Sequence, residues 1–218
     1  MDPKELIARR VALEIEPRTL VNLGIGIPTL VSDYLDEGLG VFFQAENGAV
    51  GMGHRPPEGM TDRHLTDAGG RFVSFVPGAS TIDSAFSFGL IRGGHLDLTV
   101  LGALQVDEAG HLANWMIPGH YTPGMGGAMD LVTGAKKVII AMQHTAKGEP
   151  KIVPECTLPL TSQRRIDLIV TDLAVIKPEA DGLHLLERAP GVSVAEIEAA
   201  TTAKLIHTGE VPEMPIAA

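Results

Sequence analysis

The segment from Gln44 to Gly53 carries a carboxylate at a position where an enzyme could use it. It reads Gln-Ala-Glu-Asn-Gly-Ala-Val-Gly-Met-Gly, so Glu46 follows an apolar run and precedes Asn47-Gly48, a dipeptide typical of tight turns. Ligands of open α/β sheets bind at the carboxyl ends of strands, which is where this order of residues places Glu46. Taken alone, the residues favour a simpler interpretation, a solvated glutamate in a surface turn.

A glycine-rich segment, residues 124–131, could supply backbone amides to an anion. It reads Gly-Met-Gly-Gly-Ala-Met-Asp-Leu, with Gly126 and Gly127 side by side. Consecutive amides without bulky side chains can converge on an oxyanion or a phosphate. A flexible turn before a strand explains the same residues equally well.

A second pair of glycines, Gly24 and Gly26, lies in Gly-Ile-Gly-Ile-Pro-Thr between an apolar run and a helical pattern. The spacing resembles the start of a dinucleotide-binding turn, but Thr29 occupies the place of the third glycine, so that motif fails. A tight strand-to-helix turn is the structural interpretation. Its amides could still hold a phosphate or a carboxylate.

Other kinds of active site find little support. Cys156 has no basic neighbour in the sequence that would lower its thiol pKa, and no G-x-S-x-G motif is present. The eight histidines include no pair at i, i+4 and no H-E-x-x-H motif, so no metal site is predicted. Ordinary surface or loop positions are expected for most of them, among them His54, His64, His95, His111, His120 and His144.

Apolar periodicity predicts the elements that must position these residues. Asp2 and Pro3 begin a helix whose apolar positions extend to Ile15, and Pro28 can begin a second one that ends near Leu35. Further helical patterns cover residues 81–88 and 193–203. Strands are predicted at residues 19–23, 41–43, 71–76, 98–103, 138–141, 166–170 and 173–176. Several are continuous apolar runs, so we expect an α/β fold with a largely parallel central sheet flanked by helices.

Length and charge restrict the partners. The chain has 218 residues without a linker or a repeat, which predicts a single domain over residues 1–218. Lys and Arg number 17 against 27 Asp and Glu, a net charge of −10 that disfavours nucleic acid and anionic membrane surfaces. No apolar run approaches the ~20 residues that cross a bilayer.

A cytoplasmic location is expected. One cysteine excludes an internal disulfide, and the charged residues within positions 1–20 leave no apolar stretch for a signal peptide.

The region 102–134, with seven glycines and the only tryptophan, is long for a connection. It is either a functional loop ordered by a partner or a meander of short strands.

Taken together, these segments resemble the B (beta) subunit of the family I, 3-oxoacid-type CoA-transferases. The likeness runs from about Val21 to Val175 and rests on several separate motifs in the family's order. They are residues 21–30 (Val-Asn-Leu-Gly-Ile-Gly-Ile-Pro-Thr-Leu), 46–48 (Glu-Asn-Gly), 77–80 (Pro-Gly-Ala-Ser), 91–97 (Ile-Arg-Gly-Gly-His-Leu-Asp), 112–119 (Leu-Ala-Asn-Trp-Met-Ile-Pro-Gly) and 124–132.

The resemblance implies roles for particular residues. Glu46 occupies the position of the family's catalytic glutamate, and Gly126 and Gly127 that of the glycine loop facing the thioester carbonyl. Asn47 and Gly48 then support the turn, and Gly24 and Gly26 lie in the vicinity of the substrate. Two residues depart from the family: Ala45 replaces the usual Ser, and Ala49 a larger aliphatic residue.

The resemblance also implies the reaction. CoA moves between an acyl-CoA, such as succinyl-CoA or acetyl-CoA, and a carboxylic or 3-oxo acid, through a glutamyl-CoA thioester on Glu46. Coenzyme A is a substrate, and neither a metal nor a permanently bound cofactor is expected. The segment from Trp115 to Met129 is predicted to help exclude water. The CoA-transferase (isomerase-like) fold and a separate A subunit, typically in an A2B2 assembly, complete these expectations.

Three alternative functions differ in the role that they give to the Glu46 carboxylate. A sugar-phosphate isomerase would use it as a base, although neither the Glu46 segment nor the Trp115 region looks like that family. An acyl-CoA hydrolase would let water intercept the glutamyl-CoA, an alternative that Ala45 and Ala49 leave open. A non-catalytic CoA-binding module would not need Glu46, which is nevertheless present.

Overall fold

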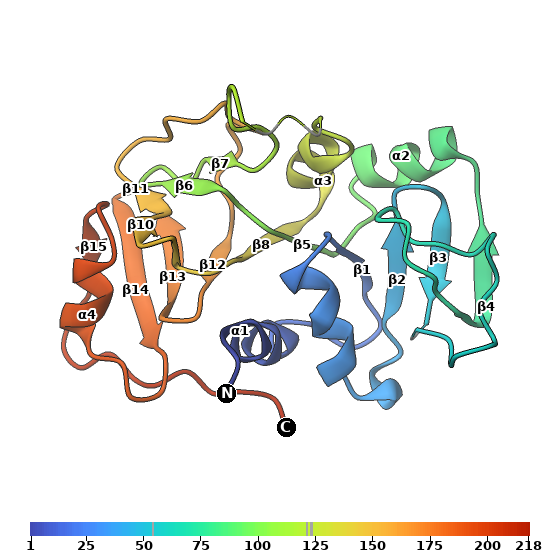
Figure 1. Cartoon of the computed structure of the whole chain (residues 1–218), viewed down its shortest axis with the longest axis horizontal. Coiled ribbons are helices and arrows are strands. Elements are labelled where there is room, and N and C mark those ends of the chain that lie inside the picture. Colours follow the sequence, from blue (N-terminus) through green and yellow to red (C-terminus); the bar gives the residue numbers. More distant parts are fainter. Residues whose placement is uncertain (54, 121, 123) are drawn as a thin grey trace.

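The computed structural model describes residues 1–53, 55–120, 122 and 124–218 and is built on one ten-stranded sheet (Figure 1). In spatial order the strands are β15 (Leu205–Ile206), β14 (Gly182–Arg188), β13 (Ala174–Glu179), β12 (Leu168–Val170), β8 (Lys137–Ala141), β5 (Leu98–Leu101), β1 (Leu20–Leu23), β2 (Phe42–Ala45), β3 (Ala49–Met52) and β4 (Phe75–Thr81). The five strands from β12 to β2 are parallel, whereas β12–β13, β13–β14, β2–β3 and β3–β4 are antiparallel. The predicted α/β fold with a parallel sheet centre is confirmed.

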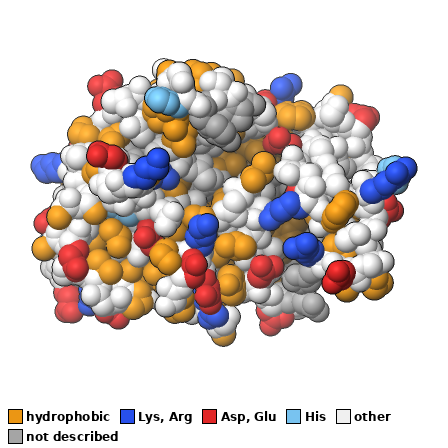
Figure 2. Space-filling view, viewed as in Figure 1, with side chains coloured by type: hydrophobic (Ala, Val, Ile, Leu, Met, Phe, Trp, Pro, Cys, Tyr) orange, Lys and Arg blue, Asp and Glu red, His pale blue; other side chains and the backbone are white. Residues whose placement is uncertain are grey.

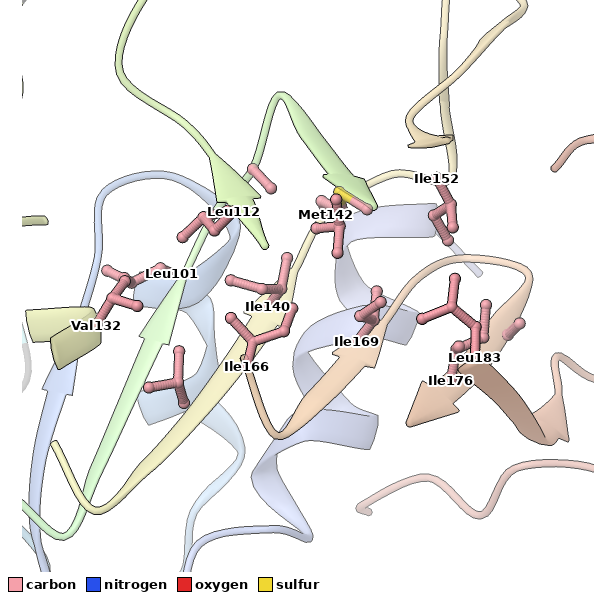
Figure 3. Packing of buried hydrophobic residues seen from close by; sticks show 14 of the residues in the cluster. Leu101, Leu112, Val132, Ile140, Met142, Ile152, Ile166, Ile169, Ile176 and Leu183 are labelled. Carbon is pink, nitrogen blue, oxygen red and sulfur yellow. The ribbon is translucent and has the colours of Figure 1, made fainter. Parts of the chain in front are cut away.

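The central strands are buried on both faces, as their apolar runs predict. In β8, Val138 and Ile140 pack into one hydrophobic cluster, while Ile139 and Ala141 pack into a second cluster. Successive side chains of a strand point to opposite faces, so both clusters extend across the sheet. Figure 3 shows the first cluster, where Ile140, Ile169 and Ile176 project from neighbouring strands.

Helical segments on one face cover the second cluster. The helix α1 (Pro3–Ala12) buries Ile7 and Val11 there, and the Asp2 carboxylate caps it by accepting a hydrogen bond from the Lys4 amide. The 3-10 helix η1 (Ile27–Tyr34) packs beside α1 (Figure 1). A short 3-10 turn, η2 (Glu37–Leu39), leads into β2. The predicted helices at both positions are confirmed, although the second is a 3-10 helix.

The elements on the other face pack around the first cluster. They are the helices α2 (Ser84–Arg92), α3 (Ala128–Gly134) and α4 (Val194–Ala199), together with a small sheet of β11 (Ile152–Val153), β6 (Gln105–Asp107) and β7 (Leu112–Ala113). A hairpin of β9 (Thr145–Ala146) and β10 (Glu149–Pro150) lies between β8 and β11 in the sequence. The region 102–134 therefore contains both short strands and the glycine loop that precedes α3.

Three predicted elements have wrong boundaries. The strand predicted at residues 71–76 begins only at Phe75, because Arg71 is tied by its side chain and amide to Asp67 in a turn. The helix predicted at residues 81–88 begins at Ser84 and extends to Arg92, since β4 continues to Thr81 and Asp83 caps the helix. The C-terminal helix is likewise shorter than predicted. The single domain over residues 1–218 stays a prediction.

The surface mixes charge types. On the face shown in Figure 2, acidic and basic side chains are interspersed among apolar groups. Within the described part of the chain, no helix has the length and apolar character needed to cross a membrane.

Candidate active site

Glu46 begins the three-residue turn between β2 and β3, and its side chain is half-buried. Ala45 pairs with Ala49 across the turn. Gly48 has a φ of +112°, and a Cβ atom there would lie 2.0 Å from the Ile82 carbonyl oxygen, so only glycine fits. The side-chain amide of Asn47 donates a hydrogen bond to the Thr66 carbonyl over 2.8 Å. The supporting role expected of both residues in the turn stays a prediction.

A buried polar row lies directly beneath this turn. Asn22 is in register with Gln44 on one side and with Thr99 on the other, so the three side chains lie side by side on β1, β2 and β5. The Asn22 amide donates to Gln44 Oε1 over 3.0 Å, and Thr99 donates to Asn22 Oδ1 over 3.2 Å. Gln44 in turn donates to Ser87 Oγ of α2 over 2.9 Å. We call these four residues the polar row.

The glycine loop reaches Glu46 from the opposite side. The Gly127 N–H donates to Glu46 Oε1 over 3.3 Å. A Cβ atom on Gly127 would lie 2.2 Å from Glu46 Oε2, and one on Gly126 would lie 3.6 Å from Oε1. Gly126 also has a φ of +53°, which favours glycine. The structure therefore brings together the carboxylate and the glycine pair that the sequence singles out.

The helix α3, which follows the glycine loop, is held at both ends. Asp130 in its first turn accepts a hydrogen bond from Arg92 of α2 over 2.7 Å. At the far end, the Arg164 guanidinium donates to the carbonyls of Val132 and Ala135, and to that of Lys136 over 3.0 Å. Carbonyls in the last turn of a helix lack intrahelical partners, so Arg164 satisfies them. This arrangement fixes where the amide of Gly127 can lie.

A cavity of about 970 Å³ opens beside Glu46 at the carboxyl ends of β1, β2 and β5. Gly24, Gly126 and Gly127 line its wall along with Glu46. Gly26 is absent from the described lining and instead forms the turn before η1, with a φ of +92°. A Cβ atom on Gly24 would lie only 3.1 Å from the Val100 carbonyl oxygen, so the glycine permits close packing against β5.

Within the region predicted to exclude water, residues 124–128 line the cavity. Trp115 does not line it among the described residues; its indole N–H donates to the Leu160 carbonyl over 3.3 Å. Positions 121 and 123 lie outside the described residues. Water exclusion by this region stays a prediction.

Two charged groups that line the cavity, Arg71 and Asp67, form an ion pair. Arg71 donates twice to Asp67 Oδ2, over 2.9 and 2.7 Å, and once to Thr29 Oγ1 over 2.7 Å. All three residues line the cavity, as does Arg55. Arg71 thus presents a guanidinium to the cavity that Asp67 largely neutralises. Neither Asp67 nor Arg71 carries a signal in the sequence: Arg71 falls in the strand predicted at residues 71–76, and Asp67 belongs to no motif.

The remaining candidates lie outside this cavity. Burial, reinforced by Asp107 and Glu155, raises the pKa of the Cys156 thiol to about 12, which suits a protonated rather than a nucleophilic sulfur. His144 lies in the loop between β8 and β9, as expected, but it is not at the surface: it is fully buried, and its ring nitrogens lie 2.9 and 2.8 Å from the hydroxyls of Thr171 and Thr201. His54 lies outside the described residues.

One group of possible metal ligands is present among the described residues, at the β13–β14 hairpin. Glu179, Asp181 and His184 place ligand atoms within 4.8 Å of one another. Their groups are already paired, since His184 contacts Asp181 at 2.8 Å and Lys177 contacts Glu179 at 2.7 Å. These residues are remote from Glu46 in the sheet and play no part in the candidate active site.

Several residues of the site carry no motif signal. Gln44, Ser87 and Thr99 belong to the polar row only because β2, β5 and α2 meet in the fold. A buried polar residue inside an apolar run, such as Gln44 after Val41-Phe42-Phe43, is the one local sign that could have indicated the row.

Known proteins are similar to this chain over most of its length. Residues 4–200 match the family described as Coenzyme A transferase. The chain is 51% identical over 217 residues to the beta subunit of the acetate CoA-transferase of Haemophilus influenzae, covering 99% of this chain and 97% of the relative. It is 48% identical over 202 residues to the B subunit of the succinyl-CoA:3-ketoacid coenzyme A transferase of Helicobacter pylori, covering 92% and 97%.

A solved structure shares the fold. The acyl-CoA transferase YdiF of Escherichia coli O157:H7, in a thioester complex with CoA, superposes with a TM-score of 0.78 at 23% identity. The match covers 99% of this chain and 43% of YdiF, so this chain spans less than half of that polypeptide. The family match covers most of the chain, and the relatives that are about half identical to it are beta or B subunits. The chain therefore belongs to the coenzyme A transferase family, as a beta subunit.

Proposed function

We propose that this chain transfers coenzyme A between an acyl-CoA and a carboxylic or 3-oxo acid, and that Glu46 carries the CoA between the two half-reactions. One observation carries the proposal: the Glu46 carboxylate borders a substrate-sized cavity and accepts a hydrogen bond from the Gly127 amide. Carboxylates act as covalent nucleophiles where they divide one difficult transfer into easier steps. The names of the relatives above support the choice of CoA as the transferred group.

The steps balance without an added reagent. A Glu46 oxygen attacks the thioester carbonyl, the C–S bond breaks, and CoA leaves as a thiolate while a mixed anhydride forms. The thiolate then attacks the Glu46 carbonyl carbon and releases the first acid as its carboxylate. The resulting glutamyl-CoA thioester is attacked by the second carboxylate, and the same steps run in reverse. One thioester replaces another, so the proposal includes no metal and no permanently bound cofactor.

The Gly127 amide has a defined place in this sequence. It lies 3.3 Å from Glu46 Oε1, the oxygen that becomes negatively charged when the thiolate adds to the Glu46 carbonyl carbon. Removing one donor to such an oxyanion typically slows a reaction by ~10²–10³. Gly126, beside it, supplies the backbone conformation that aims this amide. In the proposed mechanism the glycine pair stabilises charge, and Glu46 forms the bonds.

The proposal includes an A subunit as the partner, in an A2B2 assembly, with the chain acting as one domain in the cytoplasm. The support is that the relatives are themselves beta or B subunits, and that YdiF extends well beyond the part this chain matches. A single cysteine suits a reducing compartment.

The test traps the intermediate. The chain, combined with its A partner, is incubated with acyl-CoA in the absence of an acceptor acid, and the peptide that contains Glu46 is analysed by mass spectrometry. We expect a CoA adduct, or the corresponding alcohol after borohydride reduction. An unmodified peptide from an active preparation would contradict the covalent scheme.

Two variants complete the test. Glu46→Gln keeps the size of the side chain but removes the anion, so transfer should be abolished with an unchanged circular dichroism spectrum. Glu58→Gln, at an exposed glutamate away from the described cavity lining, is the matched control and should transfer normally. Equal rates of thioester loss with and without acceptor acid would identify a hydrolase instead. Binding of CoA without either reaction would identify a non-catalytic module.

A further inference from the structure

A second pocket lies beside the Glu46 cavity, at the carboxyl ends of β1, β5 and β8. Its volume is about 180 Å³, and Ile25, Gly102 and Ala103 line both cavities. Most of its wall is apolar, with Ile27, Pro28 and Met142 among the lining residues. The pocket is therefore a side chamber of the candidate active site.

Among the lining residues that the structure describes, Lys151 alone has a cationic side chain. It is half-buried between β10 and β11, and its backbone N–H donates to the His144 carbonyl over 3.2 Å. Among the described residues, its ammonium has no recorded ion pair or hydrogen bond, in contrast to Arg71, which Asp67 holds. Asp172 attracts the ammonium from a distance, but the Asp172 carboxylate already accepts a hydrogen bond from the His144 amide over 2.7 Å.

A partly desolvated cation without an anionic partner is costly to keep. Burial lowers the pKa of Lys151 to about 8, with the attraction of Asp172 opposing the shift. An anion that enters the pocket would remove this penalty. The chain has a net charge of −10, which repels anionic substrates, and a cation in this pocket attracts them locally.

The second pocket lies within reach of a substrate at Glu46, because the two cavities share part of their walls. The carboxyl end of β5 lies at the middle of the second pocket. In the sheet order β5-β1-β2 it is two strand intervals away from the end of β2, where Glu46 begins its turn. Two intervals correspond to roughly 10 Å. One substrate that reacts at Glu46 can therefore extend an anionic group into the Lys151 pocket.

We propose that Lys151 and its pocket bind an oxyanion group of a substrate that reacts at Glu46. The group is either a phosphate of coenzyme A or the distal carboxylate of a dicarboxylic acid, which share the chemistry that an ammonium recognises. The polar side chains of Gln143 and Thr145, which also line the pocket, suit the remaining oxygens of such a group. This inference rests on the proposed transfer reaction.

The test compares three variants of the chain in complex with its A partner. Lys151→Met removes the charge and keeps the aliphatic stem, and Lys151→Arg keeps the charge. Lys177→Met is the matched control, because Lys177 is an exposed lysine on β13 that pairs with Glu179. We measure KM and kcat for acetyl-CoA and succinyl-CoA as donors and for acetate and succinate as acceptors.

A lost charge-assisted hydrogen bond raises the KM of the substrate that it holds by about tenfold or more. For Lys151→Met we expect that rise with kcat nearly unchanged, and we expect Lys151→Arg to restore KM substantially. A rise for both CoA donors and for neither acid identifies a phosphate. A rise for succinate and succinyl-CoA, but not for acetate and acetyl-CoA, identifies a carboxylate.

The inference is overturned if KM is unchanged in Lys151→Met, or if Lys177→Met raises it equally. A separate equilibrium measurement distinguishes this failure from failure of the proposed function. Calorimetric titration of the unmodified complex and of Lys151→Met with CoA and with succinate reports anion binding even when Glu46 forms no adduct. Equal affinities of both proteins for both ligands would also contradict the inference.

Discussion

The N–H of Gly127 lies 3.3 Å from Glu46 Oε1, although 81 residues separate the two in the sequence. The contact joins the turn after β2 to the loop before α3, and it leaves no space for a side chain at Gly127. A site built from two distant turns depends on the elements that hold each of them.

Gly127→Ala should reduce kcat by about a hundredfold or more, because the new methyl group would lie 2.2 Å from Glu46 Oε2 and displace either the carboxylate or the amide. Steady-state kinetics of the complex with the A subunit measure the effect. Gly89→Ala is the control, since a Cβ at Gly89 in α2 meets nothing within 4 Å. An active Gly127→Ala enzyme would show that the amide does not take part.

Gln44→Leu should lower both stability and kcat. Gln44 is fully buried and bonds to Asn22 and to Ser87, so its loss leaves polar groups unsatisfied at a cost of about 1–3 kcal/mol. The turn that carries Glu46 starts two residues later and would lose its support. Urea unfolding and transfer kinetics are the measurements, with the exposed Gln163→Leu as control. Unchanged stability would show that the polar row is dispensable.

Arg164→Met should loosen the C-terminal end of α3, since the carbonyls of Val132, Ala135 and Lys136 lose their donor. We expect a lower Tm, a slower transfer rate and weaker labelling of Glu46 by CoA. Arg165→Met, which removes an exposed arginine next in the chain, is the matched control. If labelling and kcat persist while Tm falls, Arg164 contributes to stability alone.

His144 should make the fold less stable in acid. Burial lowers its pKa to about 4, against an ordinary value of 6.5, with Lys151 adding to the shift and Asp172 opposing it. The unfolded chain therefore binds a proton at His144 between these values and the folded chain does not, so the free energy of unfolding is highest above pH 6.5 and falls as the pH drops toward 4.

The expected loss from His144 is about 3 kcal/mol over this interval. Urea unfolding at several pH values between 7 and 4.5 measures it. His144→Gln should flatten this part of the pH dependence, whereas the exposed His64→Gln should keep it. An identical slope in His144→Gln would contradict the assignment.

The sheet centre was predictable because its physics is local. The apolar runs of β5, β8 and β12 report burial on both faces, and the structure has each strand close to the predicted range. The alternation of buried Leu183 and Leu185 also indicates a strand, β14, although none is predicted there from the sequence. The boundaries of β4 and α2 were misplaced because the Asp67–Arg71 pair and the Asp83 cap decide them.

The candidate site was predictable only in part. The place of Glu46 at the end of a strand follows from the residues around it, and the resemblance to a known family indicated the glycine pair. Asn22, Gln44 and Thr99 form a row only when three strands align in register, and no spacing in the sequence specifies that register. Lys151, 105 positions after Glu46, likewise comes to line the neighbouring pocket only through the fold.

Glu46 stands where the sheet changes from parallel to antiparallel pairing, between β1–β2 and β2–β3. At such a boundary the chain reverses within three residues, whereas a parallel connection needs a long crossover. The residue that we expect to bear the coenzyme is thus anchored by backbone pairing on both sides and has little freedom to swing. Main-chain movement that admits reactants and discharges products is therefore expected in the loops that line the cavity rather than in the backbone of the carrier residue.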